Sequence, residues 1–195
     1  MKLILLSIFI GLFSLAGCEN GSKKKPGAPE SKPVNQGNFP SEWTGTWKAQ
    51  DNEWVIRIEP NGQVFKIYHV MGDLLDFRGP KKLHVEGKSG SYADLELGEC
   101  SSSYNPENRQ FYLTVSIDHY LMHFPEGDLE GSTIDNFTGI IPTQGNEWKM
   151  QLFSIHFLAG ADPPNTNPSP KEVIFQRMTR EELEKWPNGK AFFGD

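Results

Sequence analysis

Histidine side chains are the groups in this 195-residue chain best suited to chemistry, and their spacing argues against a metal centre. His119 and His123 are four residues apart within the segment 111–124, in which apolar residues alternate with polar ones. This alternation predicts a β-strand, where such residues are about 13 Å apart and cannot bind one ion together. If the apolar face points inward, both histidines lie in the interior with His69 from another predicted strand. We therefore expect structural or partly exposed histidines and no metal site.

The motifs of common enzyme classes are not found in the sequence. It contains no Gly-x-Ser-x-Gly, no His-Glu-x-x-His, no phosphate-binding glycine-rich loop and no paired-cysteine motif. The acidic segment 126–130 lacks the ordered Asp/Asn series and the terminal Glu of a calcium loop. We expect no catalytic residues, no cofactor and no enzyme activity.

The N-terminal segment has the proportions of a signal peptide. Lys2 supplies a positive charge, residues 3–13 are apolar except for Ser7, and Leu15-Ala16-Gly17-Cys18 closes the run. The apolar stretch is shorter than the roughly 20 residues that span a membrane comfortably. The segment is therefore expected to be a processed signal, with a plain secretory signal as the alternative.

Leu15-Ala16-Gly17-Cys18 resembles the lipobox of bacterial lipoproteins. The resemblance implies that residues 1–17 are removed and that Cys18 is lipidated and anchors the chain to a membrane of the cell envelope. Enterobacterial lipoproteins retained in the inner membrane carry aspartate at the next position, where this chain has Glu19. In a Gram-negative host the resemblance therefore favours the periplasmic face of the outer membrane.

Cys100 is the one other cysteine in the chain. If Cys18 is lipidated, Cys100 has no intrachain partner, which excludes a disulfide scaffold. We expect a buried, inert thiol, with an intermolecular disulfide as the alternative.

Composition divides the rest of the chain into a tether and one domain. Residues 18–40 are rich in Lys, Pro, Gly, Ser and Asn and carry almost no large apolar residue, so we expect a disordered tether. Residues 41–195 are long enough to bury one core. The net charge is −6 and no basic stripe with aromatic residues is present, so nucleic acid is not an expected partner.

Period-two patterns predict an all-β domain. The expected strands are 44–48, 53–59, 63–70, 82–85, 91–97, 109–124, 133–141, 148–157 and 173–178. The short loops between them favour an antiparallel meander of about eight or nine strands closing into a lipocalin-like barrel, with a β-sandwich as the alternative. Thr179 and Glu182 form a capping box that predicts a short C-terminal helix. The candidate lumen-facing residues are Trp54, Phe65, His69, His119 and His123.

Gly45-Thr46-Trp47 resembles the Gly-x-Trp signature of lipocalins and their calycin relatives. In that family the tryptophan closes one end of the barrel and an arginine of the last strand packs across it. The resemblance implies that Gly45, Trp47 and Arg177 form this closure, although the family's Thr-Asp-x-x-Tyr turn signature is not found.

Two functions of different kinds fit this domain. One is a non-enzymatic protein that binds a small apolar or amphipathic ligand in its lumen. The alternative is a protein-interaction module with a solid core, acting as an envelope-assembly, stress-sensing or inhibitor lipoprotein on another envelope protein.

Overall fold

The computed structural model describes residues 39–51, 53–69, 73–86, 90–160, 165–166, 170–187 and 189–190. The predicted signal peptide, Cys18 and the tether up to residue 38 lie outside the described residues. Within the described part, no helix combines the length and the apolar character needed to cross a membrane.

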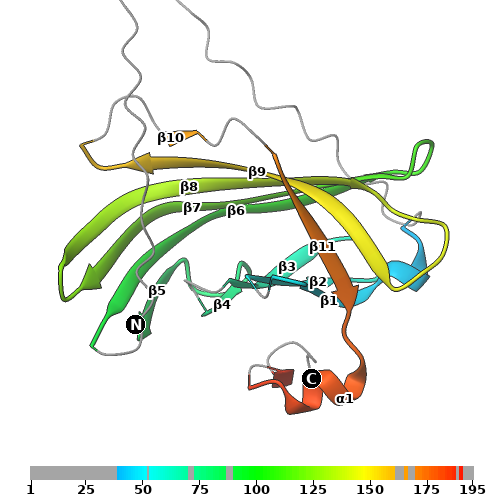
Figure 1. Cartoon of the computed structure of the whole chain (residues 1–195), viewed down its shortest axis with the longest axis horizontal. Helices are drawn as coiled ribbons and strands as arrows, with labels where there is room; N and C mark the ends of the chain where they lie inside the picture. Colours follow the sequence, from blue (N-terminus) through cyan, green and yellow to red (C-terminus); the bar gives the residue numbers. More distant parts are fainter. Residues whose placement is uncertain are drawn as a thin grey trace, which may run out of the picture. The chain divides into compact units, whose positions relative to one another are not determined.

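Eleven antiparallel strands form one strongly curled sheet (Figure 1). They are β1 (Gly45–Ala49), β2 (Trp54–Ile58), β3 (Val64–His69), β4 (Asp73–Asp76), β5 (Lys82–Glu86), β6 (Tyr92–Asn105), β7 (Gln110–Phe124), β8 (Gly127–Ile140), β9 (Glu147–Leu158), β10 (Asn165–Thr166) and β11 (Lys171–Arg177). A 3-10 helix η1 (Ser41–Trp43) precedes β1, and the helix α1 (Arg180–Lys185) follows β11. The predicted all-β fold and short C-terminal helix are confirmed.

The strand order is β4-β3-β2-β1-β11-β9-β8-β7-β6-β5, with β10 paired to β9. Strands from the two ends of the domain are adjacent in the sheet: β1 pairs with β11, and Trp47 lies opposite Arg177. Among the described residues no ladder joins β4 to β5, so the sheet is a half-barrel with a seam between these two strands. The closure without free edges that the sequence suggested is therefore incomplete at this seam.

Side chains bridge β3 and β6 near the seam. The Ser102 hydroxyl donates to the carbonyl of Gly62 (3.0 Å) and accepts from the amide of Val64 (3.2 Å). The Cys100 thiol donates to the carbonyl of Val64 (3.1 Å). These bonds satisfy backbone groups that would otherwise need a neighbouring strand.

A bulge interrupts the alternation of β6 and β7. Glu96 pairs with His119, but the next residue, Leu97, pairs with Ile117. Ser116 stabilises the bulge, because its hydroxyl accepts from the amide of Glu99 (2.7 Å) and donates to Asp118 Oδ1 (3.2 Å). An extra residue in a strand moves every following side chain to the opposite face.

Two apolar clusters fill much of the inner face of the half-barrel. The first contains the largest fully buried side chains, which are Trp43, Trp47, Trp148, Phe111, Phe137 and Phe175. The second contains Leu75, Ala93, Leu95, Leu97, Ile117, Tyr120 and Met122. In the first cluster Trp43 stacks on Trp47 with ring centroids 4.8 Å apart, and Trp148 meets both edge-on.

The C-terminal helix covers the outer face of β2. Leu183 packs against Val55, and Trp186 meets Tyr68 edge-on with ring centroids 5.2 Å apart. The predicted capping box is present, since Thr179 accepts from the amide of Glu182 and the Glu182 side chain accepts from the amide of Thr179. Both faces of β2 are therefore buried.

Candidate ligand site in the half-barrel

Gly45, Trp47 and Arg177 lie together at one end of the half-barrel. The Arg177 guanidinium carbon is 5.6 Å from the centroid of the Trp47 ring, and the group donates to the carbonyls of Glu42 (2.7 Å) and Thr44. Gly45 has φ of +112°, and a Cβ there would lie 3.4 Å from an Arg177 nitrogen. Because L side chains rarely adopt this φ, glycine suits the close approach of Arg177. This end of the half-barrel is filled by packed side chains.

Trp54 and His69 face each other on neighbouring strands at the inner face. Their ring centroids are 4.3 Å apart, and Trp54 also meets Phe137 edge-on at 5.0 Å. Phe65 does not join them. It is the extra residue of a bulge, because Ile58 pairs with Val64 and Arg57 pairs with Lys66. The Phe65 ring is partly exposed and lies 4.9 Å from the Arg78 guanidinium carbon.

His119 and His123 lie on the outer face, so the expectation that they face the lumen is corrected. Tyr120 and Met122 are buried on the inner face, and alternation places the two histidines opposite them. The cause is the bulge at residue 118, which the sequence pattern does not reveal. His119 Nε2 is 2.9 Å from Glu130 Oε1, and His123 Nδ1 is 2.9 Å from Asp128 Oδ1.

A group of polar residues lies on the inner face between the apolar clusters. Asp135 on β8 is opposite Ser154 on β9, and Thr133 is opposite His156 in the same ladder. Asp135 is only 7% exposed, although its neighbour two residues along β8 is the core residue Phe137. We call Thr133, Asp135, Ser154, His156 and His69 the inner polar cluster.

Hydroxyl groups hold the Asp135 carboxylate. Ser154 Oγ donates to Oδ1 at 2.5 Å, and Thr133 Oγ1 lies 3.5 Å from Oδ2. Burial raises the pKa of Asp135 above its usual value, and the hydrogen bond from Ser154 and the positive charge of His156 oppose this rise. A buried carboxylate is favourable only when charges or hydrogen bonds compensate for lost hydration.

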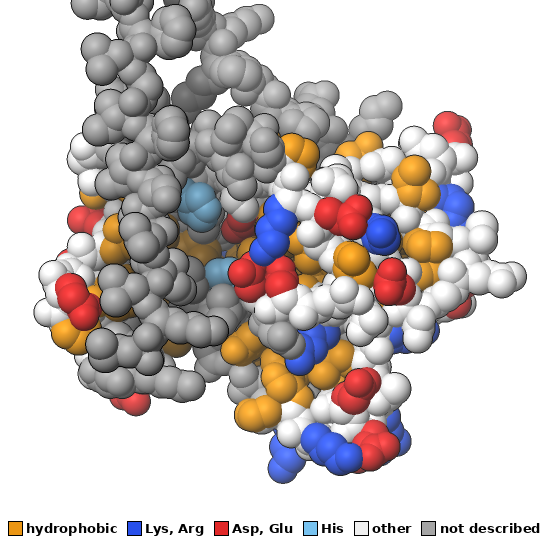
Figure 2. All heavy atoms as spheres, in the orientation of Figure 1, with side chains coloured by type: hydrophobic (Ala, Val, Ile, Leu, Met, Phe, Trp, Pro, Cys, Tyr) orange, Lys and Arg blue, Asp and Glu red, His pale blue; other side chains and the backbone are white. Residues whose placement is uncertain are grey.

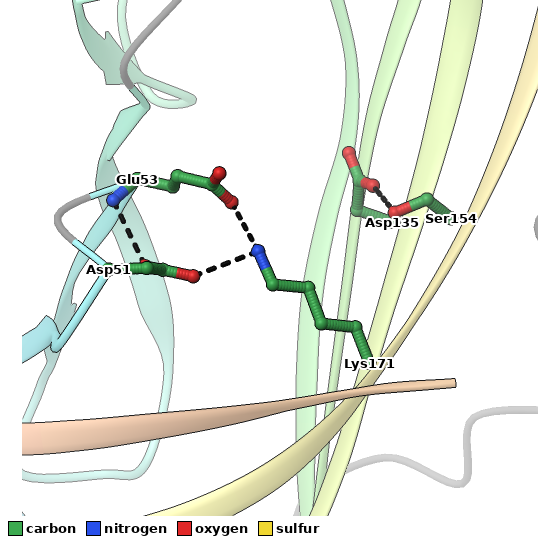
Figure 3. Close-up of polar contacts among 5 residues, drawn as sticks. All are labelled: Asp51, Glu53, Asp135, Ser154 and Lys171. Atoms are coloured by element: carbon green, nitrogen blue, oxygen red, sulfur yellow. Dashed lines mark hydrogen bonds and ion pairs between the residues drawn. The ribbon is translucent and has the colours of Figure 1, made fainter. Parts of the chain in front are cut away.

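His69 is neutral at physiological pH. Burial lowers its pKa to about 4, an effect opposed by the charge of Glu53 and strengthened by that of His156. The nearby Lys171 is engaged elsewhere, because its Nζ lies 2.6 Å from Glu53 Oε2 and 2.9 Å from Asp51 Oδ2 (Figure 3).

The inner polar cluster is suited to binding a polar group by hydrogen bonds and charge. The Ser154 hydroxyl is bound to a carboxylate, whereas a nucleophilic serine is activated by a neighbouring base such as imidazole. Within the described ranges, no group of three His, Cys, Asp or Glu side chains is arranged to hold a metal ion. The sequence analysis did not identify Asp135, Ser154, Thr133 or His156 as site residues. Asp135 could have been noticed, because it is two residues from Phe137 and therefore lies on the same face of the strand.

A hollow lies on the outer face of β5 and β6. It is an open groove of about 350 Å³ lined by Lys82, Leu83, His84, Asp94, Leu95, Glu96 and His119. Its polar side chains already have partners: His84 Nδ1 lies 2.7 Å from Asp94 Oδ1, and Lys82 Nζ lies 3.6 Å from Glu96 Oε2. Figure 2 shows how acidic and basic side chains intermingle with hydrophobic ones on the face that it draws.

Comparison of the chain with family models, with curated proteins and with solved structures returns no significant match.

Proposed function

We propose that this protein is a lipid-anchored lipoprotein of the bacterial cell envelope that binds a small amphipathic ligand in its half-barrel and performs no catalysis. The observation that carries the proposal is the buried Asp135 with its hydroxyl partners, on the inner face of the sheet between two apolar clusters. A carboxylate in such a place costs stability, and ligand sites are typically apolar surfaces with a few convergent polar groups.

The half-barrel differs in packing on the two sides of the inner polar cluster. This difference supports binding on the side away from Trp43, Trp47 and Trp148. On one side, the side chains of Trp43, Trp47, Trp148 and Phe111 are fully buried. On the other side, Tyr120 and Met122 continue the inner face toward Leu129, which is opposite Met122 and is 38% exposed. A ligand would place its polar group at Asp135 and its apolar part along this second side.

The anchor is the part of the proposal that rests on sequence alone. We expect the full-length chain to sediment with membranes and to take up a radiolabelled fatty acid. Cys18→Ser should abolish the labelling and release the protein, whereas Cys100→Ser should change neither. Fatty acid labelling that persists in Cys18→Ser would refute lipidation at Cys18.

Ligand binding is tested by native mass spectrometry of the full-length chain purified from its host. We expect a retained small molecule in the wild type. Ser154→Trp should displace it, because the new side chain occupies the inner face. Gln151→Trp is the matched control, since Gln151 lies on the same strand and is exposed. A wild-type protein that carries no small molecule, or equal retention in both variants, would contradict binding in the half-barrel.

A second candidate function is a protein-interaction module. The fully buried side chains at the tryptophan end favour it, because such a module needs a solid core rather than a lumen. Ile140 is 61% exposed and Tyr112 is 47% exposed, and both lie on strands of the main sheet. In this case Ser154→Trp would leave crosslinking to envelope proteins unchanged. Ile140→Asp together with Tyr112→Asp would abolish that crosslinking.

A further inference from the structure

Strand β5 is the last strand of the sheet at the seam, and in the described part of the chain one of its two backbone edges joins no ladder (Figure 1). The amide of Leu97 donates to the carbonyl of Lys81 (2.7 Å), which sets the phase of the pairing between β5 and β6. Residues 81, 83 and 85 therefore direct their backbone groups to β6, and residues 82, 84 and 86 direct theirs away from it. An edge of this kind can pair with another strand.

The apolar cluster on the inner face is incompletely covered at β5. Leu95 and Ala93 on β6 are 3% and 6% exposed, whereas Leu83 and Val85, which lie opposite them on β5, are only half-buried. Leu83 and Val85 pack against the second apolar cluster, so they are on the inner face. A further strand beside β5 would cover these two side chains, and burial of apolar surface is favourable.

The outer face of β5 carries charges that match those of the same strand in a second copy of the chain. Lys82 and Glu86 are at the two ends of β5 and His84 is at its middle, and all three are exposed. If two copies of β5 pair antiparallel about a two-fold axis at His84, Lys82 of each copy lies opposite Glu86 of the other. On the inner face, Leu83 of each copy then lies opposite Val85 of the other. Opposite charges and apolar side chains in such cross-strand positions stabilise a sheet.

This register is the best that β5 can form with itself. The smallest shift that keeps the two faces matched is two residues, and it places His84 opposite Lys82 or Glu86 and removes both pairs of opposite charge. A charge at a sheet edge disfavours pairing with a strand that does not match it, and a second copy of β5 does match. The strand across the seam, β4, has Asp73 and Asp76 at its ends and no cationic residue, so it is not complementary to itself.

We infer that this protein forms a symmetric dimer in which two β5 strands pair antiparallel and join the two curled sheets. Each partner presents the same surface, as a two-fold interface requires. Lys82 then lies between Glu96 of its own chain, 3.6 Å away, and Glu86 of the second copy. The inference goes beyond the proposed function and does not depend on the ligand.

The first test measures the oligomeric state of the full-length Cys18→Ser chain by sedimentation velocity over a concentration series. We expect an equilibrium between monomer and dimer. Lys82→Glu or Glu86→Lys alone should raise the Kd of the dimer at least about tenfold, because each replaces two attractive pairs by two repulsive ones. An equimolar mixture of the two variants should dimerise again, since opposite charges then face each other at both positions.

Lys149→Glu is the matched control for the change in net charge. Lys149 is exposed and paired with a carboxylate, as Lys82 is, but it lies on β9. This variant should leave the Kd of the dimer within about twofold, because an exposed ion pair contributes little.

A disulfide tests the register. The two-fold axis places residue 84 opposite its own copy, with Cα atoms about 5.5 Å apart, which is within the range of a disulfide. His84→Cys in the Cys18→Ser chain should therefore form a linked dimer on mild oxidation. Asp94→Cys is the control, because Asp94 is exposed on the next strand and the two copies of this residue would be roughly 14 Å apart.

Three results would overturn the inference: a chain that stays monomeric at every concentration, a Kd that does not respond to the charge reversals, or equal crosslinking of the two cysteine variants. Crosslinking of His84→Cys to another envelope protein, in a chain that itself stays monomeric, would also overturn it and would assign the edge to a different partner. None of these results changes the expected retention of a small molecule in the half-barrel, so the failure of one proposal is distinguishable from the failure of the other.

Discussion

His69 makes folding stability depend on pH in a way that one substitution removes. Its pKa is lowered from 6.5 to about 4, chiefly by burial, so the folded state binds this proton less readily than the unfolded state. Stability therefore falls as pH falls from above 6.5 toward 4. At pH 5 about 97% of unfolded chains carry the proton, against about 10% of folded ones. Integrating between pH 7 and pH 5 gives a loss of about 2 kcal/mol.

The assay is urea unfolding of the full-length Cys18→Ser chain at pH 7, 6 and 5, followed by tryptophan fluorescence. We expect His69→Gln to lose about 2 kcal/mol less than the wild type over this range, whatever its stability at pH 7. His119→Gln is the control, because His119 is exposed on the outer face and its loss should leave the His69 contribution in place. Wild-type and His69→Gln curves that run parallel between pH 7 and pH 5 would refute the burial argument.

Three further predictions concern the barrel end, the free thiol and the bulge. Arg177→Met should lower the unfolding free energy in urea by about 2 kcal/mol, because it removes two hydrogen bonds to carbonyls and the contact with Trp47. Arg180→Met is the control, since the ion pair of Arg180 is exposed, and it should cost less than about 0.5 kcal/mol. An equal cost for both would contradict the closure. Burial raises the pKa of Cys100 to about 12, so in the Cys18→Ser chain an aromatic disulfide reagent at pH 8 should react about 100-fold more slowly than after unfolding. Rapid reaction of the folded chain would show an accessible thiolate. Ser116→Ala should cost about 1–2 kcal/mol of unfolding free energy, because it leaves the amide of Glu99 without its acceptor. Ser103→Ala, at a partly buried site, serves as the comparison.

The strands and the terminal helix could be predicted because their signals are local. Alternation marks β2 and β9, and the capping box marks α1, without reference to the rest of the chain. The two unexpected strands, β4 and β10, have four and two residues, which is too short for a pattern to emerge. The sequence predicts a strand at 91–97, whereas β6 continues to Asn105 because its second half pairs with β7.

The candidate site could be predicted only in part because its geometry depends on pairing between distant residues. The bulge at residue 118 is held by Ser116, whose partners Glu99 and Asp118 come from two strands. Without it, the uninterrupted alternation from Phe111 places His119 and His123 inside. Asp135 is placed inside by the same alternation that places Phe137 there, but a single acidic residue in a strand pattern does not reveal that Ser154 is opposite it.

One substitution of Asp135 should preserve or raise the stability of the protein and weaken its binding function. Because burial raises the pKa of this carboxyl, the folded state binds its proton more tightly than the unfolded state, and stability is lost as pH rises above the usual range of the group. Asp135→Asn has no such titration, so at pH 7 it should be at least as stable as the wild type in urea, while it should no longer retain the small molecule in native mass spectrometry. A residue retained solely for folding would behave differently, since its replacement would destabilise the protein. A loss of more than about 1 kcal/mol of unfolding free energy in Asp135→Asn at pH 7, with retention of the small molecule unchanged, would assign the carboxylate to structure. A stable variant that retains no small molecule would assign the carboxylate to ligand binding, because a residue that costs stability is expected at a binding site, where function sets its identity.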